Sequence, residues 1–496
     1  MEQAREQWGT RVGFLLAAIG SAIGLGNIWR YPYVAYENGG GAFLIPYFIA
    51  LATAGIPILI LEYALGHSTR GSGPKAYRSI RERWEWLGWW QLAVSFVIAT
   101  YYMVILGWAL SYTYFAIGTQ WGEDTDAFFF ESYLGVGEEF WSLGGIQLSV
   151  LVPVLIMWAA VYFVLLRGVR RGIELASRIL MPVLVIMLIA IVIRGVTLPG
   201  AAEGLNVLLT PDFSALLDGT VWIAAYGQVF FTLSIAFAIM IAYSSYLPRR
   251  TDLSNNGFIA ALSNCSFEFL AALGVFAVLG FLAVQQNVAV DEVATSGIGL
   301  AFIAFPSIIN QFPALNSLFG VLFYGSLVFA GFTSAISILE AIISGVRDKF
   351  GLSRTGAVNL VCGAAFLVSL IYTTGGGIGF LDIVDHFINN YGLVLSGLVQ
   401  VLLVGWIARE LPRLRDHINR VSDVYVGAWW TISLRFITPL ILGAATAYNI
   451  YEELSAAYGD YPVSALLTLG GGVALGAVII GFVLSMPRWR GTETTG

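Results

Sequence analysis

Long apolar runs recur along the whole chain, and they constrain its fold more than any other feature. Each run reaches the roughly 20 residues that an α-helix needs to cross the hydrocarbon core of a bilayer. The chain has 496 residues, of which 58% are hydrophobic and 11% charged, and this charge is too little to cover a water-facing surface. The runs are continuous rather than alternating, so they predict membrane-spanning helices and argue against a β-barrel.

The apolar runs number about twelve, counted by length. They lie near residues 10–36, 41–67, 89–118, 148–166, 172–196, 218–247, 255–285, 316–347, 355–374, 379–408, 426–451 and 462–486. Basic residues cluster in every second connection, and several of the remaining connections are acidic. Because basic loops face the cytoplasm, both termini are expected inside and the number of spans is expected to be even. Arg30, Arg194 and Arg435 fall outside this pattern.

Two of the runs contain residues that a plain membrane helix does not need. Residues 20–27 (GSAIGLGN) place glycines and Asn27 near mid-bilayer, and each glycine weakens a helix by roughly 1 kcal/mol relative to alanine. The run near 218–247 carries Gln228 and Thr232 among phenylalanines. Helices interrupted at matching places in two halves indicate the binding site of a secondary transporter. Close helix packing by glycine is the alternative explanation for the first run.

Ionisable and amide groups also fall within or at the edge of the runs, where a charge is costly unless it is paired or functional. They are Glu62, Arg30, Asn264, Glu268 and Asp385. A further run supplies Thr333 and Ser334, for which hydrogen bonding back to their own helix is the alternative interpretation. Neutral oxygens with few carboxylates suit a monovalent hard cation better than a divalent one.

Five ordered motifs give the sequence a family resemblance. They are residues 8–11 (WGTR), 24–32 (GLGNIWRYP), 38–43 (NGGGAF), 227–234 (GQVFFTLS) and 330–334 (AGFTS). On these residues the chain resembles the neurotransmitter:sodium symporter family, and within it the prokaryotic amino-acid branch. The resemblance implies an all-α polytopic membrane protein with the LeuT-like fold. This fold is a five-plus-five inverted repeat with broken helices 1 and 6, among about twelve transmembrane helices.

The resemblance also implies a domain organisation. Residues 1–410 would form the transport core, with repeat A near 10–196 and repeat B near 218–408. Residues 411–496 would hold two peripheral transmembrane helices and the C-terminal tail. These last two helices are expected to pack outside the core or to mediate self-association, as in a homodimer. The implied location is the inner or plasma membrane of the cell, with N- and C-termini in the cytoplasm.

By resemblance, the chain is a sodium-coupled symporter that imports neutral L-amino acids with aliphatic or aromatic side chains by alternating access. The substrate-binding positions carried over are Ser21, Ala22, Leu25, Gly26, Ile98, Tyr102, Phe231, Thr232, Ser234, Phe237, Ser334 and Ile338. Two sodium ions would be co-transported. The first site would use Ala22, Asn27, Thr232 and Asn264, and the second would use Gly20, Ile23, Ala330, Thr333 and Ser334.

Two gates and a buried acid complete the implied site. The outer gate would be Arg30, Asp385, Tyr102 and Phe231, and the inner gate would be Arg5, Trp8, Ser245, Tyr246 and Asp348. Glu268, near Tyr47 and Gln228, stands where chloride-dependent members have a serine. Its carboxylate would replace the negative charge of chloride and could exchange a proton in antiport. Gly24 stands where monoamine carriers have an aspartate, so the substrate is expected to bring its own carboxylate. Glu62 is a further buried acid.

Other functional classes find less support in the sequence. A membrane enzyme would need a nucleophile–base pair, a metal cluster or a cofactor motif, and the sequence contains none that we recognise. We therefore expect no catalytic residues and no organic cofactor. The expected partners are the amino acid, sodium ions and the lipid bilayer, with no nucleic acid. A membrane amino-acid sensor with the same fold but no transport cycle remains the alternative.

Overall fold

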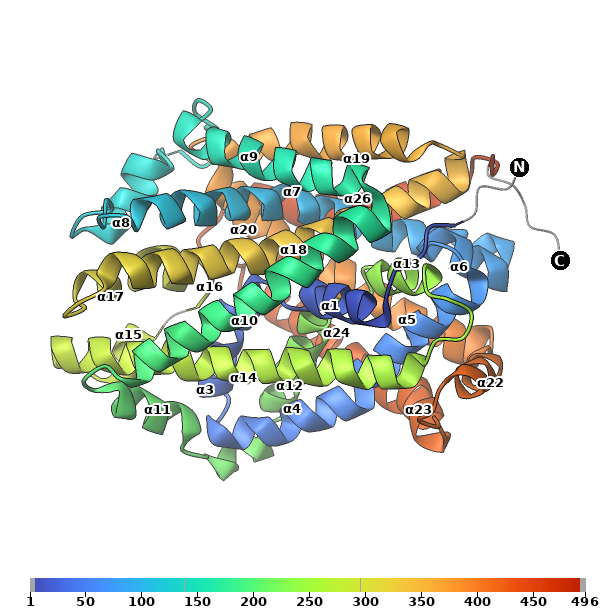
Figure 1. The fold of residues 1–496 in the computed structure, drawn as a ribbon, viewed down its shortest axis with the longest axis horizontal. Coiled ribbons are helices and arrows are strands. Elements are labelled where there is room, and N and C mark those ends of the chain that lie inside the picture. The colour runs from blue at the N-terminus through green and yellow to red at the C-terminus, as the bar shows by residue number, and fades with distance from the viewer. Residues whose placement is uncertain (1–4, 138, 295, 491–496) are drawn as a thin grey trace.

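The computed structural model describes residues 5–137, 139–294 and 296–490, and these residues form helices and connections without a β-strand (Figure 1). Ten helical segments are long and apolar enough to cross a membrane. They are Gly41–Thr69 (α4 Leu44–Ala50 and α5 Ile56–Thr69), Glu82–Phe115 (α7 Glu85–Phe115), Leu148–Leu166 (α9), Val169–Val196 (α10 Leu175–Val196), Leu253–Gln286 (α14), Asn316–Phe350 (α18), Arg354–Thr373 (α19 Arg354–Ser369), Gly377–Ile407 (α20 Gly377–Phe387 and α21 Val394–Leu402), Ala428–Ser455 (α23 Ala428–Ile432 and α24 Thr438–Ser455) and Val463–Ser485 (α25 Val463–Ala465 and α26 Gly472–Ser485). The prediction of a polytopic helical membrane protein is confirmed.

Shorter helices connect these segments. They are α6 Gly73–Ile80, α8 Thr125–Ala127, α11 Ala201–Leu209, α15 Val290–Val293, α16 Gly297–Gly299, α17 Phe305–Asn310 and α22 Leu411–Val421. Most of them lie at the two ends of the long helices, as Figure 1 shows for α8, α6 and α22.

The first apolar run is a bent chain of helices. Helix α1 (Arg11–Ala22) starts at Thr10, whose hydroxyl accepts a hydrogen bond from the Gly13 N–H over 2.9 Å. The helical path stops at the glycine-rich segment and resumes in α2 (Leu25–Trp29) and α3 (Tyr31–Glu37), with a bend of 58°. Counted as one span, this bent pair raises the number of candidate spans in the described residues from 10 to 11.

The run predicted near 218–247 is two short helices, α12 (Gly219–Thr232) and α13 (Ile239–Ser245). Between them Ser234, Ala236 and Ala238 have φ angles of 51°, 67° and 59°, in the left-handed region that residues other than glycine rarely adopt. Neither helix is long enough to cross a membrane alone. The twelfth span therefore stays a prediction.

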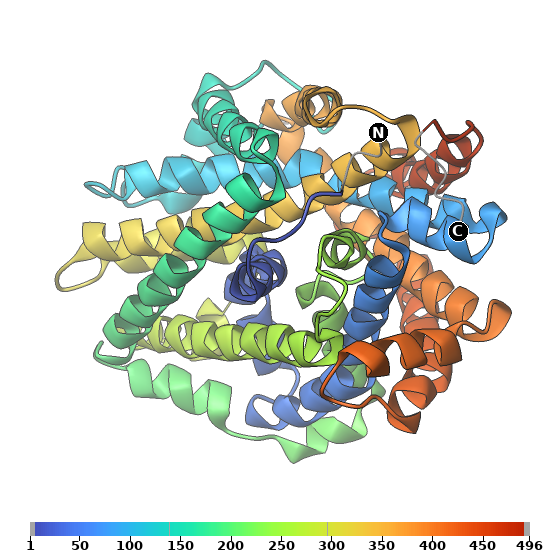
Figure 2. The same cartoon turned by 45° about the vertical axis from the view of Figure 1, so that its right-hand side comes forward.

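The interrupted segments lie inside the helical bundle. Helix α1 contacts α10, α14 and α18, and Figure 2 views it nearly end-on among them (dark blue). Ser21, Asn27 and Thr232 are all buried. Because protein surrounds the breaks, their freed backbone groups face other protein groups or a cavity instead of hydrocarbon.

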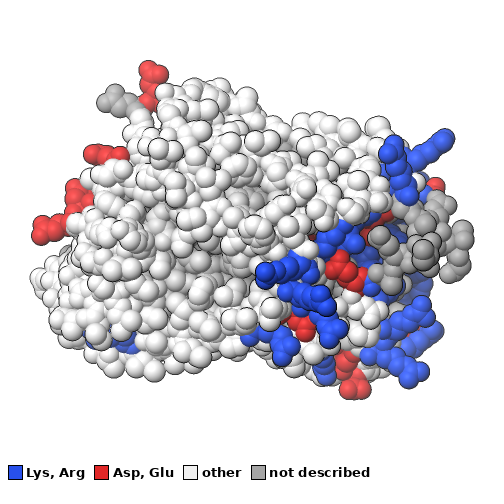
Figure 3. Space-filling model, turned by 45° about the horizontal axis from the view of Figure 1, so that its top comes forward, with Lys and Arg blue, Asp and Glu red and all other residues white. Residues whose placement is uncertain are grey.

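Charge is distributed unevenly between the two ends of the molecule. Lys and Arg side chains gather at the right-hand end in Figure 3, and acidic side chains mark the other end. The basic end contains Arg5 and Arg490, because Arg5 pairs with Asp348 and the Arg490 N–H bonds to the Lys349 carbonyl. This asymmetry is what the basic loops of a membrane protein produce.

Candidate functional site

One cavity of about 580 Å³ opens between the interrupted segments, α7 and α18. Its lining includes all the substrate positions implied by the sequence: Ser21, Ala22, Leu25, Gly26, Ile98, Tyr102, Phe231, Thr232, Ser234, Phe237, Ser334 and Ile338. The cavity continues past Arg30 and Asp385 to His386 and Tyr458, near the acidic end. It therefore joins the centre of the bundle to one side of the molecule.

The start of α2 supplies one polar wall of this cavity. The backbone N–H groups at the start of a helix have no partner within the helix, and they favour negative charge. At Gly24 a Cβ would lie only 3.2 Å from the Tyr102 hydroxyl and 3.3 Å from Ser334 Oγ. At Gly26 a Cβ would meet Phe231 Cε1 at 2.7 Å. The glycines thus let these side chains pack close to the backbone at the start of α2.

Apolar side chains also line the cavity. Ile98 from α7, Phe231 and Phe237 from the α12–α13 region, and Ile338 from α18 line it. Ser334 adds a hydroxyl. A carboxylate near the start of α2 and an apolar side chain against these residues would satisfy both parts.

The predicted first sodium site is a group of amides and hydroxyls that the structure brings together. Asn27 Nδ2 donates to Thr232 Oγ1 over 3.0 Å and to Asn264 Oδ1 over 2.9 Å. The Asn27 Oδ1 atom accepts from the Gly24 N–H over 2.7 Å. Ala22 lines the same cavity. Polar side chains of three helices, α2, α12 and α14, thus meet at the break in the first run.

The predicted second sodium site lies between the break and α18. Ser334 Oγ is 3.4 Å from the Gly20 carbonyl oxygen, 3.2 Å from that of Ser21 and 3.1 Å from that of Ile23. Thr333 Oγ1 donates to the Ala330 carbonyl over 2.9 Å within its own helix. Carbonyl and hydroxyl oxygens of this kind are hard ligands that suit alkali cations.

Glu268 is fully buried beside the predicted first sodium site. Its carboxylate accepts hydrogen bonds from Gln228 Nε2 over 2.8 Å, from Thr232 Oγ1 over 2.6 Å and from the Tyr47 hydroxyl. Gln228 Oε1 is buried and has no partner among the described residues. Its hydrogen-bond donors are all neutral, and Arg30 is a cationic residue close enough to act on it electrostatically.

Glu62 occupies a second buried position on α5, outside the cavity. Its Oε1 atom accepts from the Ala236 N–H over 2.8 Å and from Gln400 Nε2 over 3.2 Å. The first bond ties α5 to the left-handed segment between α12 and α13. Its Oε2 atom has no partner among the described residues. The structure thus places Glu62 as a support of the break and not as a ligand in the cavity.

The predicted outer gate is not closed by an ion pair. Asp385 accepts from the Tyr101 hydroxyl over 2.5 Å and from Asn389 Nδ2 over 2.8 Å, and no ion pair joins it to Arg30 in the described residues. The Arg30 guanidinium instead lies over the Phe231 ring, 4.8 Å from its centroid. Tyr102 lines the cavity beside Phe231. These four residues all line the cavity, which continues between them toward the acidic end.

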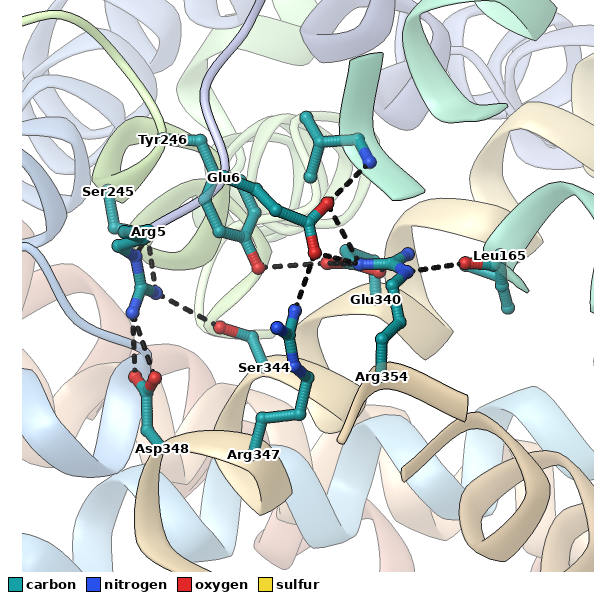
Figure 4. A network of polar contacts seen from close by, with 11 residues as sticks. Arg5, Glu6, Leu165, Ser245, Tyr246, Glu340, Ser344, Arg347, Asp348 and Arg354 are labelled. Carbon is teal, nitrogen blue, oxygen red and sulfur yellow. Dashed lines mark hydrogen bonds and ion pairs between the residues drawn. The ribbon is translucent and has the colours of Figure 1, made fainter. Parts of the chain in front are cut away.

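The predicted inner gate is closed at the basic end (Figure 4). Arg5 Nη1 lies 2.8 Å from Asp348 Oδ1, and Arg5 Nη2 donates to Ser245 Oγ over 2.7 Å. The guanidinium also lies 4.9 Å from the Tyr246 ring centroid. Trp8 Nε1 donates to the Tyr243 carbonyl over 2.8 Å. These contacts hold the segment before α1 against α13 and α18.

Sequence reasoning missed a second set of charges next to this gate, also drawn in Figure 4. Glu6 pairs with Arg347 at 2.7 Å and with Arg354 at 3.1 Å. Arg354 also pairs with Glu340 at 2.8 Å, and Glu340 accepts from the Tyr246 hydroxyl over 2.8 Å. In the sequence the two arginines look like ordinary basic loop residues. Glu340 could have been recognised from the sequence as a candidate functional residue, because it is an acidic residue within an apolar run.

Glu6 lies before the first span, and its environment favours the charged form. Although partial burial opposes this, Arg354, the Val169 N–H and Arg347 together hold the pKa of the Glu6 carboxyl below its usual value. The Val169 N–H donates to Glu6 Oε2 over 2.8 Å. Glu6 therefore remains ionised and connects the chain before α1 to the connections around α10 and α19.

Comparison with known proteins agrees with this geometry. The model of the sodium:neurotransmitter symporter family matches residues 5–127 and 119–490. An uncharacterized sodium-dependent transporter of Methanocaldococcus jannaschii is 41% identical over 484 residues, which cover 97% of each chain. The sodium- and chloride-dependent GABA transporter 2 of Bos taurus is 30% identical over 493 residues, covering 92% of this chain and 81% of the relative. The chain therefore belongs to the sodium:neurotransmitter symporter family, whose members are sodium-dependent transporters and not enzymes.

Proposed function

We propose that this symporter imports neutral L-amino acids with aliphatic or aromatic side chains, together with two sodium ions, by alternating access. The single observation that carries the proposal is the cavity beside the break in the first run. It combines a backbone wall suited to a carboxylate with the apolar wall formed by Ile98, Phe237 and Ile338. Gly24 supports this substrate class, because no carboxylate of the protein occupies that position.

The polar groups around the cavity support coupling to sodium. The oxygens of Asn27, Thr232 and Asn264 adjoin the place proposed for the substrate carboxylate. A sodium ion there would interact directly with the substrate's charge, so each would bind better in the presence of the other. The oxygens around Ser334 would hold the second ion at the junction of α1 and α18.

The buried carboxylate of Glu268 supports two finer points of the proposal. It provides a fixed negative charge next to the first sodium site, so transport would not require chloride. It would also accept a proton after sodium leaves and carry it back, which is proton antiport. The bovine relative is chloride-dependent by its name, so this property would separate the two proteins.

The remaining topological points belong to the same proposal. Residues 1–410 would form the core of two inverted repeats, and 411–496 the peripheral helices, available for a homodimer. The basic end of the molecule would face the cytoplasm, with both termini inside and the inner gate opening there. The segment 219–245 would complete a twelfth span as two half-helices.

Uptake into proteoliposomes tests the substrate class. Radiolabelled leucine, alanine, tyrosine and tryptophan would be offered with an inward sodium gradient, and with potassium as the control. We expect sodium-dependent accumulation of at least one. Sodium-dependent binding without accumulation would favour the sensor instead. Neither binding nor uptake of any of the four would contradict the proposed substrate class.

Replacing Glu268 tests chloride independence. Wild-type uptake should be the same in chloride and in gluconate, whereas Glu268→Ser should need chloride because its fixed negative charge is gone. The matched control is Glu62→Gln, which changes a buried acid away from the sodium oxygens and should not create a chloride requirement. A chloride requirement in the wild type would contradict the proposed chloride independence.

A further inference from the structure

Arg435 is a charged residue on the outer surface of a membrane span. It lies in the segment Ala428–Ser455, within a widened helical turn at Ser433–Ile437. The position is roughly 10 Å of helix rise from the start of the segment at the basic end. Neither the cavity nor the gates use this residue. A charge at this depth is costly unless something neutralises it.

The protein itself offers no counter-charge to this arginine. In the described parts of the chain, the Arg435 side chain makes no hydrogen bond and no ion pair, and its Nε atom is shut off from water without a partner. Arg194, near the end of another span, also has an Nε atom without a partner, but its Nη2 donates to the Ala314 carbonyl over 3.1 Å. Of the acidic residues in the nearby connection, Glu410 is paired with Arg413 at 2.6 Å, and neither Asp416 nor Asp423 forms an ion pair with Arg435 in the described residues.

Trp406 fixes the position of the guanidinium. The Arg435 Cζ atom lies 5.2 Å from the centroid of the Trp406 ring, which is an attractive cation–π geometry. Trp406 Nε1 in turn donates to the Arg435 carbonyl over 2.6 Å, and its ring meets Phe436 edge-on at 5.3 Å. The two residues therefore form one ordered unit that joins the end of the span Gly377–Ile407 to Ala428–Ser455.

The side chains around this unit face outward into the lipid region. Trp406 is 45% exposed, Ile432 49% and Phe436 52%. Tryptophan at the end of a span is typical of the membrane interface. A ligand that covers this surface must carry an anionic group for Arg435 and an apolar chain for its neighbours. A phospholipid has both groups, arranged in this order along its length.

We propose that Arg435 and Trp406 form a binding site for the phosphate of an anionic phospholipid, in the leaflet at the basic end of the molecule. The phosphate would pair with the guanidinium, and an acyl chain would lie along Ile432 and Phe436. A zwitterionic lipid fits less well, because its cationic group would meet the basic residues of the adjoining connection, including Arg409 and Arg413. The site is separate from the transport cavity and does not depend on the substrate proposed above.

Quenching of tryptophan fluorescence by brominated lipid tests the site directly. The protein would be placed in nanodiscs that contain a minor fraction of brominated phosphatidylglycerol in phosphatidylcholine, or the reverse mixture. The Trp406 signal is the difference between the wild type and Trp406→Phe. We expect preferential quenching by the anionic lipid, with a local enrichment of about fivefold for one arginine at the membrane surface. Equal quenching by both lipids in the wild type would overturn the proposal.

Three variants separate this site from general surface charge. Arg435→Gln should abolish the preference at Trp406, and Arg435→Lys should keep part of it. Arg250→Gln removes the same charge from another basic connection and should leave the preference unchanged. If Arg435→Gln keeps the preference, or Arg250→Gln removes it equally, the assigned residues are wrong.

A second tryptophan provides the internal control. Trp429 is 37% exposed and donates to the Ala52 carbonyl over 3.1 Å, and no arginine lies over its ring in the described residues. Its signal, obtained with Trp429→Phe, should show little preference between the two lipids. A preference equal to that of Trp406 would mean that the anionic lipid gathers around the whole end of the protein, which contradicts a site at Arg435.

Discussion

Ser334 has more acceptors around it than its single proton can serve. Its hydroxyl lies within 3.4 Å of the carbonyl oxygens of Gly20, Ser21 and Ile23, and it can donate to one of them at a time. These carbonyls come from the end of α1, where the helical hydrogen bonds stop. A cation among them would satisfy several oxygens at once, which is a physical reason for a sodium ion at this junction.

Removing this hydroxyl should weaken sodium binding and leave the fold intact. We expect Ser334→Ala to raise the sodium concentration for half-maximal uptake about five- to tenfold, the equivalent of ~1–1.5 kcal/mol for one lost oxygen ligand. The control is Ser337→Ala, because the Ser337 hydroxyl donates to the Ser334 carbonyl within α18 over 2.7 Å. Equal effects of the two substitutions on the sodium dependence would contradict the second sodium site.

Helix α22 is joined to the end of α5 by a pair of histidines. His67 Nε2 lies 2.9 Å from the Pro248 carbonyl oxygen, which can only accept, so this nitrogen carries a proton. His67 Nδ1 then accepts from His417 Nε2, 2.9 Å away, when both rings are neutral. Burial, followed by the charges of His67, Arg413 and Arg420, lowers the pKa of His417 to about 4. If both rings were protonated, His67 Nδ1 and His417 Nε2 would each carry a proton, and the two N–H groups would point at each other instead of forming a hydrogen bond.

Acid should therefore weaken the attachment of α22. The folded protein binds fewer protons at His417 than the unfolded chain, whose ordinary pKa is 6.5, so stability falls as the pH drops from 6.5 toward about 4. We expect thermal unfolding followed by intrinsic fluorescence to show this loss in the wild type and a smaller loss in His417→Asn. A pH dependence unchanged by His417→Asn would refute the assignment.

The whole molecule is closed at one end and open at the other. At the basic end Arg5, Glu6 and Glu340 take part in ion pairs that join the segment before α1 to α18 and α19. At the acidic end the cavity continues past Arg30 and Asp385 without a direct pair between them. In the transport cycle proposed above, the substrate would enter from the acidic side. The ion pairs of the basic end would then have to break before release on the other side.

Weakening the inner gate should loosen the start of α1. Arg5→Gln removes the pair with Asp348, and we expect the amides of residues 8–15 to exchange with deuterium at least about tenfold faster, the equivalent of ~1.4 kcal/mol of local opening. Arg11→Gln is the control, since Arg11 donates to Asn256 and lies outside the ion-pair network. Unchanged exchange in Arg5→Gln would show that the pair does not hold the gate.

Local composition was enough to predict the membrane class and the places where the first run and the run near 218–247 are interrupted. A long apolar run forms a helix in a bilayer whatever its neighbours, because the backbone must bond within the segment. Glycines at 20–26 and polar residues at Gln228 and Thr232 interrupt the pattern locally, so they could be recognised before any fold was known. The family resemblance then supplied the proposed substrate positions, which the structure gathers around one cavity.

Tertiary structure alone decided which distant groups meet. Glu6 and Arg354 are far apart in the sequence, and so are His67 and His417, and nothing in either neighbourhood indicates its partner. The sequence also does not show that the Arg435 Nε atom lacks a hydrogen-bond partner in the described residues, because this depends on which groups the fold brings close to it. The sequence determines where helices form and break through local backbone energetics. Which charges pair, and which stay free for a ligand, depends on how the helices pack.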